Sequence, residues 1–158
     1  DLAGTSHFEY TSNERGIKVM CSARMDADFI YEAYRLGAGA VLYSGCHQQD
    51  CHYITGQVIG AKRAKRLETI FERMNMTPGR FRVEWISAAE GDKYARVLNE
   101  MQATLDAMPE ADLLAEIERL RPEMAKRLSR LPNIPGVQRA LDHTQVVVNT
   151  ILSREGAQ

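Results

Sequence analysis

The chain of 158 residues lacks a strong net charge, a long hydrophobic run and an abundance of cysteine. Its formal net charge of -1 gives no overall basic field, so the composition does not favour binding to nucleic acid or to an anionic membrane. No apolar run approaches the roughly 18 residues of a membrane-spanning helix, so we expect neither membrane insertion nor a signal peptide. The three cysteines, an odd number, fit a reducing setting, and we expect a cytoplasmic protein.

The residues that are present describe an ordinary globular domain. The chain is 44% hydrophobic and 26% charged, which excludes a disordered composition and is enough for one domain with a core. Runs of β-branched residues alternate with stretches of helical periodicity. We expect strands at 17–21, 40–45 and 82–86, and helices at 26–37, at 58–76 and from about Ala88.

Strands that are separated by helices pair in parallel, because only a crossover connection can return the chain to the same edge. The pattern therefore predicts an α/β fold: a doubly wound, flavodoxin-like parallel sheet with helices on both faces. The start of the helix near Ala88 rests on a capping box. In Ser87-Ala88-Ala89-Glu90 the hydroxyl can satisfy one free helix N–H while Glu90 reaches back to another.

Beyond Met108 the chain changes character, because prolines punctuate helical stretches and no further strand is evident. Pro109 and Pro122 suit the first turn of a helix, which predicts separate helices at 110–120, 123–131 and 137–153. Their apolar stripes favour either packing against the chain's own domain or docking to a partner. We expect two parts, a domain at 1–108 and a helical docking extension at 109–158.

The chemistry of the chain is concentrated after two predicted strands. Cys46, His47, Cys51 and His52 follow the strand at 40–45, and Cys21 ends the strand at 17–21. Parallel strands bring their carboxyl ends to one edge, so we expect the three cysteines to converge there on a metal or redox site. Three thiolates, with a further cysteine or a histidine as fourth ligand, suit a metal or redox centre. A tetrahedral zinc site with one histidine is the alternative for the same atoms.

Several neighbouring residues receive supporting roles. We expect His47 and His52 to form hydrogen bonds around the site in preference to ligation, and Arg24 to stabilise an anionic cluster. A thiol enzyme is disfavoured, because Cys46 and His47 are adjacent on an extended segment and point apart. The basic run at 62–66 is interrupted by alanine, which favours a solvated or partner-facing surface over nucleic-acid contact.

Four separated segments together resemble the delta subunit family of methyl-viologen-reducing hydrogenase, over roughly residues 1–105. They are DLAGTS at 1–6, VMCSAR at 19–24, GCHQQDCHY at 45–53 and EWISAAEG at 84–91. The family usually shows Cys-Ser-Gly-Arg and Cys-His-Pro-Gly-Asp-Cys-His, where this chain has Ala23 and Gln48-Gln49. These differences alter backbone freedom in the two cysteine loops and remove no thiol.

The resemblance implies an electron-transfer subunit or domain that carries a 2Fe-2S cluster, with Cys21, Cys46 and Cys51 among its ligands and no substrate active site of its own. It implies electron relay between a hydrogenase or other donor and a heterodisulfide-reductase-like flavoprotein. The family has a further strand and a cysteine-rich turn ahead of the segment that matches Asp1. We therefore expect an upstream stretch or a partner chain to supply a parallel strand and a further cysteine. The alternative is a zinc-stabilised interaction subunit of a multiprotein complex.

Overall fold

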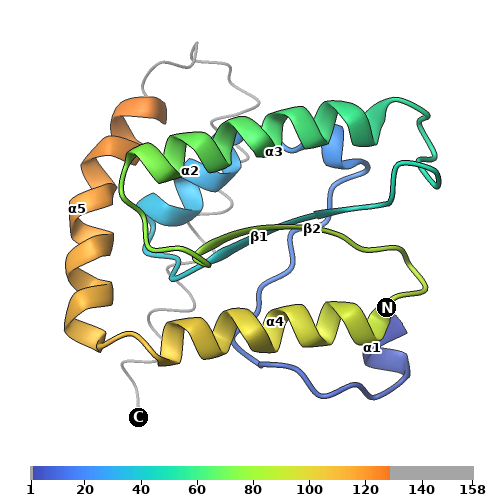
Figure 1. Ribbon diagram of the computed structural model, residues 1–158, viewed down its shortest axis with the longest axis horizontal. Helices are drawn as coiled ribbons and strands as arrows, with labels where there is room; N and C mark the ends of the chain where they lie inside the picture. Colours follow the sequence, from blue (N-terminus) through green and yellow to red (C-terminus); the bar gives the residue numbers. More distant parts are fainter. Residues whose placement is uncertain (1, 129–158) are drawn as a thin grey trace.

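The computed structural model describes residues 2–128, which form a two-stranded parallel sheet with helices on both faces (Figure 1). Strand β1 (Val41–Gly45) pairs with β2 (Phe81–Trp85). Helices α2 and α3 cover one face of the sheet, and α4 covers the other. The helices are α1 (Leu2–Thr5), the short 3-10 helix η1 (Ser22–Arg24), α2 (Ala27–Arg35), α3 (Gly56–Arg73), α4 (Gly91–Asp106) and α5 (Glu110–Leu128).

The predicted α/β class and parallel pairing are confirmed. Within residues 2–128 the sheet has two strands, so it does not establish the larger doubly wound, flavodoxin-like sheet that we expect from the sequence. No helix in this part of the chain combines the length and hydrophobicity needed to cross a membrane.

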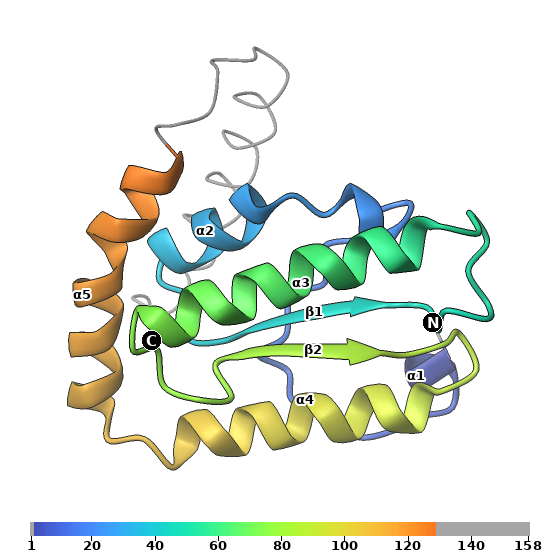
Figure 2. The same ribbon diagram turned by 45° about the horizontal axis from the view of Figure 1, so that its top comes forward.

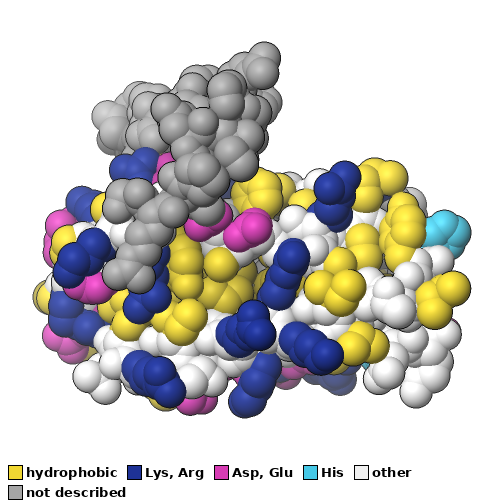
Figure 3. All heavy atoms as spheres, turned by 90° about the horizontal axis from the view of Figure 1, so that it is seen from above, with side chains coloured by type: hydrophobic (Ala, Val, Ile, Leu, Met, Phe, Trp, Pro, Cys, Tyr) yellow, Lys and Arg dark blue, Asp and Glu magenta, His cyan; other side chains and the backbone are white. Residues whose placement is uncertain are grey.

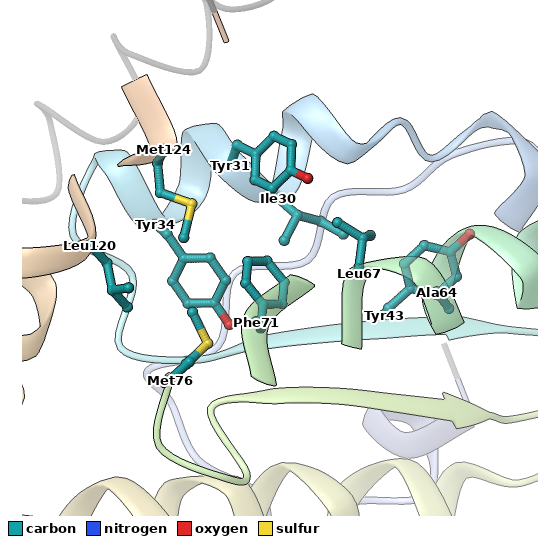
Figure 4. Close-up of a cluster of buried hydrophobic side chains, with 10 residues drawn as sticks. All are labelled: Ile30, Tyr31, Tyr34, Tyr43, Ala64, Leu67, Phe71, Met76, Leu120 and Met124. Carbon is teal, nitrogen blue, oxygen red and sulfur yellow. The ribbon is translucent and has the colours of Figure 1, made fainter. Parts of the chain in front are cut away.

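The core lies between α2, α3, β1 and α5 (Figure 4). Aromatic rings pack edge to face at its centre, where the ring centroids of Tyr34 and Phe71 lie 5.4 Å apart. Such pairs add to the free energy of burying the rings themselves. Its buried members are Ile30, Tyr31, Tyr34, Tyr43, Ala64, Leu67, Phe71, Met76, Leu120 and Met124.

The expected strand at 17–21 is wrong. These residues form an extended coil that leads into η1, and Ile17 and Met20 are 61% and 78% exposed. A strand needs a neighbouring backbone to satisfy its N–H and C=O groups, and the sheet of the described residues consists of β1 and β2 alone. The β-branched sequence here therefore has no strand partner.

The expected break at Pro122 is also wrong, because α5 is one helix that contains this proline. Its buried residues, among them Leu120 and Met124, lie on both sides of Pro122 and join the core beside α2. Burial of both sides offsets the lost backbone hydrogen bond. The expected helix at 137–153 lies outside the described residues, as does the end of the one at 123–131.

An ion pair with little exposure fixes α5 to the amino ends of the strands. Arg80, which precedes β2, is 0% exposed, and its Nη1 lies 2.9 Å from Oε1 of Glu116 on α5. Arg80 Nε also donates to the carbonyl oxygen of Gly39 at 2.6 Å, and the Tyr34 hydroxyl donates to the carbonyl oxygen of Arg80 at 2.8 Å. The segments that enter both strands are thereby tied to α2 and α5.

Candidate functional site

The candidate site lies at the carboxyl ends of β1 and β2, at the opposite end of the sheet from α5 (Figure 2). Cys46 directly follows β1, Cys51 lies in the loop before α3, and Cys21 immediately precedes η1. The three cysteines thus come from two segments, the coil before η1 and the loop between β1 and α3.

Side-chain hydrogen bonds hold η1 in this position. The Tyr43 hydroxyl on β1 donates to the carbonyl oxygen of Ser22 at 2.6 Å. Arg63 on α3 donates to the carbonyl oxygens of Ala23 and Met25. Gly45 allows close approach, since an ideal Cβ at this position would lie 2.7 Å from Cβ of Ser22. The coil that carries Cys21 is therefore fastened to both β1 and α3.

Two of the thiols lie next to Gly56, the first residue of α3. An ideal Cβ on Gly56 would lie 2.5 Å from Sγ of Cys21 and 3.5 Å from Sγ of Cys51. The nearby Cys51 and Cys21 thiols both help to raise the pKa of Cys46, so the three thiols lie close enough to influence one another. The predicted convergence of the cysteines is thus observed, and only a residue without a side chain fits between two of them.

The surroundings of Cys46 and Cys51 shift the pKa values of the two thiols in opposite directions. The Gln57 backbone N–H donates to Sγ of Cys51 at 3.2 Å, and this bond is the main cause that lowers the pKa of Cys51. Desolvation is the main cause that raises the pKa of Cys46, and the nearby Cys51 adds to it. The start of α3 therefore favours negative charge on the Cys51 sulfur.

The donor atoms suit a thiophilic metal centre in kind. Within residues 2–128, no group of three His, Cys, Asp or Glu side chains is already arranged to hold a metal ion. The three thiols share one edge of the molecule, with one N–H directed at sulfur, which is a typical surrounding of an iron–sulfur cluster. Three thiolates would leave one position of such a cluster for a further ligand.

His47 contacts Glu90, the residue that precedes α4. Its Nε2 lies 2.6 Å from Oε2 of Glu90, and the same carboxylate oxygen accepts the Ser87 backbone N–H at 2.7 Å. These two contacts, the Ser87 bond first, lower the pKa of Glu90 to about 2. The return of Glu90 to Ser87 confirms the predicted capping contact, although α4 begins at Gly91 and not near Ala88.

The other two predicted site residues lie at the surface. His52 is exposed, and its ring centroid is 5.1 Å from that of Tyr53, in an edge-on arrangement. Arg24 is exposed and lines an open hollow of about 480 Å³ together with Cys21 and Gly56. The structure thus places Arg24 in the same hollow as Cys21, and its role beside an anionic cluster stays a prediction. It leaves the metal-binding roles of the cysteines and histidines as predictions.

Two contributors were missed in the sequence: Gly56 as the spacer between thiols, and Glu90 as the partner of His47. A glycine at the start of a helix just after a cysteine is a usable signal for the first. The pairing of Glu90 with His47 joins residues 43 positions apart, and local sequence carries no signal for it.

The fold and the gathered thiols define an α/β domain with a cysteine-bearing edge. Residues 1–109 match the family described as methyl-viologen-reducing hydrogenase, delta subunit. The chain belongs to this family, which confirms the resemblance seen in the four sequence segments.

Curated relatives fall into two groups. In the first, the chain is 41% identical over 106 residues to a polypeptide of the ferredoxin/F(420)H(2)-dependent CoB-CoM heterodisulfide reductase of Methanosarcina acetivorans, a match that spans 67% of this chain and 13% of that protein. In the second, it is 39% identical over 105 residues to the iron-sulfur subunit of the F420-non-reducing hydrogenase of Archaeoglobus profundus, covering 66% and 77% of the two chains. The corresponding iron-sulfur subunit of the vhc hydrogenase of Methanococcus voltae is 36% identical over 108 residues, covering 68% and 75%.

Proposed function

We propose that this chain is an electron-transfer subunit or domain that holds a 2Fe-2S cluster through Cys21, Cys46 and Cys51. The observation that carries the proposal is that two chain segments bring three thiols to one edge, with the sulfurs of Cys21 and Cys51 both next to Gly56 and Cys46 near them. Membership of the family supports it, as does the description of several relatives as iron-sulfur subunits.

A bound cluster would supply the capacity to accept and release one electron at a time. The chain's own residues would set its surroundings. Gly56 leaves room between the sulfurs of Cys21 and Cys51. The Gln57 N–H donates to the Cys51 sulfur, and Arg24 adds a positive charge at the hollow, so both favour an anionic group. The Glu90 contact holds His47 and with it the backbone next to Cys46.

The proposed role is a relay between a hydrogenase or another donor and a heterodisulfide-reductase-like flavoprotein. Support comes from the relatives, which are named as components of both kinds of enzyme. In this role the chain would pass electrons and would not transform a substrate itself.

Metal analysis of the full chain, purified without oxygen, tests the proposal. We expect iron and acid-labile sulfide in equal amounts, with an electron paramagnetic resonance signal after one-electron reduction. Ser22→Ala is a matched control, because it lies beside Cys21 and removes no thiol. Zinc without sulfide would contradict the cluster and would support the zinc-stabilised interaction subunit instead.

A further inference from the structure

The surface around the thiols is unusually apolar. Of nine exposed large hydrophobic side chains among residues 2–128, five lie on the two segments that carry or directly follow Cys21 and Cys51. We call these five the apolar collar: Ile17, Met20, Tyr53, Ile54 and Ile59. Met20, Tyr53 and Ile59 line the same hollow as Cys21. Exposed apolar side chains that gather in one place mark a binding surface.

Ile54, the most exposed member of the apolar collar, also has an unfavourable backbone conformation. Its φ of 59° lies in the left-handed region, which a β-branched residue rarely adopts, and its side chain is 83% exposed. The turn is closed by the Ile54 N–H, which donates to the carbonyl oxygen of Cys51 at 2.9 Å. Neither burial nor backbone preference explains an isoleucine here, whereas contact with a partner would.

The charged residues on the collar's own two segments are all basic. Segments 15–25 and 51–67 contain seven Lys and Arg residues and no Asp or Glu, in a chain whose formal net charge is only -1. Lys62 and Arg66 are exposed on α3, and Lys65 pairs with Glu68, just beyond the segment. The nearest acids by sequence are Glu14, Asp26, Asp50 and Glu68, which border the two segments.

Figure 3 shows this face with α2 and α3 towards the viewer. Hydrophobic side chains gather at the end that carries a histidine, Lys and Arg side chains lie among and beside them, and most visible Asp and Glu side chains lie over the other half. The apolar centre with a basic border is therefore a property of the thiol end of the molecule.

We propose that the apolar collar docks an electron-exchanging partner protein whose own contact surface has an apolar centre bordered by carboxylates. The proposal rests on the proposed function, since it names the partner surface for the same thiol site. A basic border would steer and orient an acidic protein surface, while the collar would supply the dry centre of the contact. Nucleic acid offers negative charge but little apolar surface for the collar, whereas an anionic lipid surface offers both, so the crosslinked species distinguishes lipid from protein.

A photocrosslink tests the docking surface. Ile54 is replaced by photoreactive p-benzoylphenylalanine in the full chain, expressed in its source cells, and irradiated complexes are mapped by mass spectrometry. We expect a crosslink to a partner segment that contains Asp or Glu. Lys62→Glu should lower its yield about tenfold, because like charges would then face each other. Changing one of the mapped partner carboxylates to Lys should restore the yield in the Lys62→Glu chain.

Two controls make the test specific. The same photoreactive residue at Leu114, which is 54% exposed on α5, should not crosslink this segment, and Arg96→Glu on α4 should leave the Ile54 yield unchanged. A crosslink only to nucleic acid or lipid, a target segment without carboxylates, or an equal effect of Arg96→Glu would overturn the proposal. The crosslink is repeated in the Cys51→Ser chain to separate docking from cluster binding. Iron analysis of that variant tests the proposed function, and the yield of the Ile54 crosslink tests docking.

Discussion

At the amino ends of β1 and β2, Arg80 is fully buried, paired with Glu116 and bonded to the carbonyl oxygen of Gly39. At the carboxyl ends of the same strands, Cys21, Cys46 and Cys51 are all partly exposed, and their loops carry an exposed apolar collar. At the amino end the buried charge is paired within the chain, whereas at the carboxyl end thiols are partly exposed and apolar side chains are exposed to solvent.

The buried ion pair and the proposed cluster site thus lie at opposite ends of a small sheet. Removing a partner at the buried end leaves a charge without compensation, which costs far more than removing a partly exposed group. Substitutions at the thiol end should therefore change cluster binding or docking with little effect on folding, and substitutions at the α5 end should do the reverse.

The largest expected effect is that of Glu116→Gln. It leaves the Arg80 guanidinium buried without its counter-charge, and we expect a loss of about 3–5 kcal/mol in the free energy of unfolding. Urea unfolding of the full chain measures it. Glu118→Gln on the same helix is the matched control, since its pair with Arg121 is largely exposed, and its cost should stay within about 1 kcal/mol. Equal effects of the two variants would refute the stabilising role of the buried pair.

Cys51→Ser should have the opposite profile. A serine oxygen is a poor substitute for a thiolate on iron, so cluster incorporation should be abolished. The free energy of unfolding of the metal-free chain should change by less than about 1 kcal/mol, because the thiol is only partly buried. His52→Ala should retain iron, because we expect this exposed ring to influence the cluster without binding it. The substitution should therefore shift only the reduction potential. Equal loss of iron in both variants would make His52 a ligand.

Gly56→Ala should give an intermediate effect. The added methyl group would meet the Cys21 sulfur at 2.5 Å, so the thiol must move, and we expect iron content to fall to about half under conditions that saturate the unaltered chain. Folding should not suffer, because alanine favours a helix more than glycine does. Gly4→Ala, where nothing lies within 4 Å of the added carbon, is the control. Full iron content in Gly56→Ala would show that the spacing between these thiols is not critical.

The smallest effect concerns pH. The Ser87 N–H and His47 lower the pKa of Glu90 from its ordinary value of 4.5 to about 2. A carboxylate whose pKa is lowered by folding stabilises the folded chain at any pH above its pKa in the unfolded chain. That contribution is lost as pH falls from about 4.5 towards 2. Melting temperatures across this range should fall more steeply in the unaltered chain than in Glu90→Gln. Parallel curves would mean that the contact does not stabilise the loop.

Much of this fold could be predicted from the sequence, because local pattern and tertiary structure agree for β1, β2 and the helices that connect them. The segment at 17–21 has strand composition but no partner in the described sheet, so its composition misled. Pro122 is a helix breaker by local rules, yet α5 continues through it because Leu120 and Met124 are buried on either side. In both cases long-range packing decided the outcome.

For the candidate site too, contacts between distant segments were the part that the sequence could not predict. The convergence of the cysteines was predicted for a partly wrong reason: Cys46 does follow a parallel strand, but Cys21 ends a coil, which Tyr43 and Arg63 fasten in place. The capping contact of Glu90 could be predicted because it spans three residues. The attachment of His47 to Glu90 and the buried pair of Arg80 with Glu116 could not, because each joins side chains from distant segments.

The central claim is that the thiols at the carboxyl end of the sheet bind a cluster of iron and sulfur. X-ray absorption at the iron edge, on the full chain purified without oxygen, tests it most directly. We predict a first shell of sulfur around iron together with a short iron–iron distance, and loss of both in Cys51→Ser. A first shell of only nitrogen and oxygen, or an iron-free chain that contains zinc bound by sulfur, would contradict it.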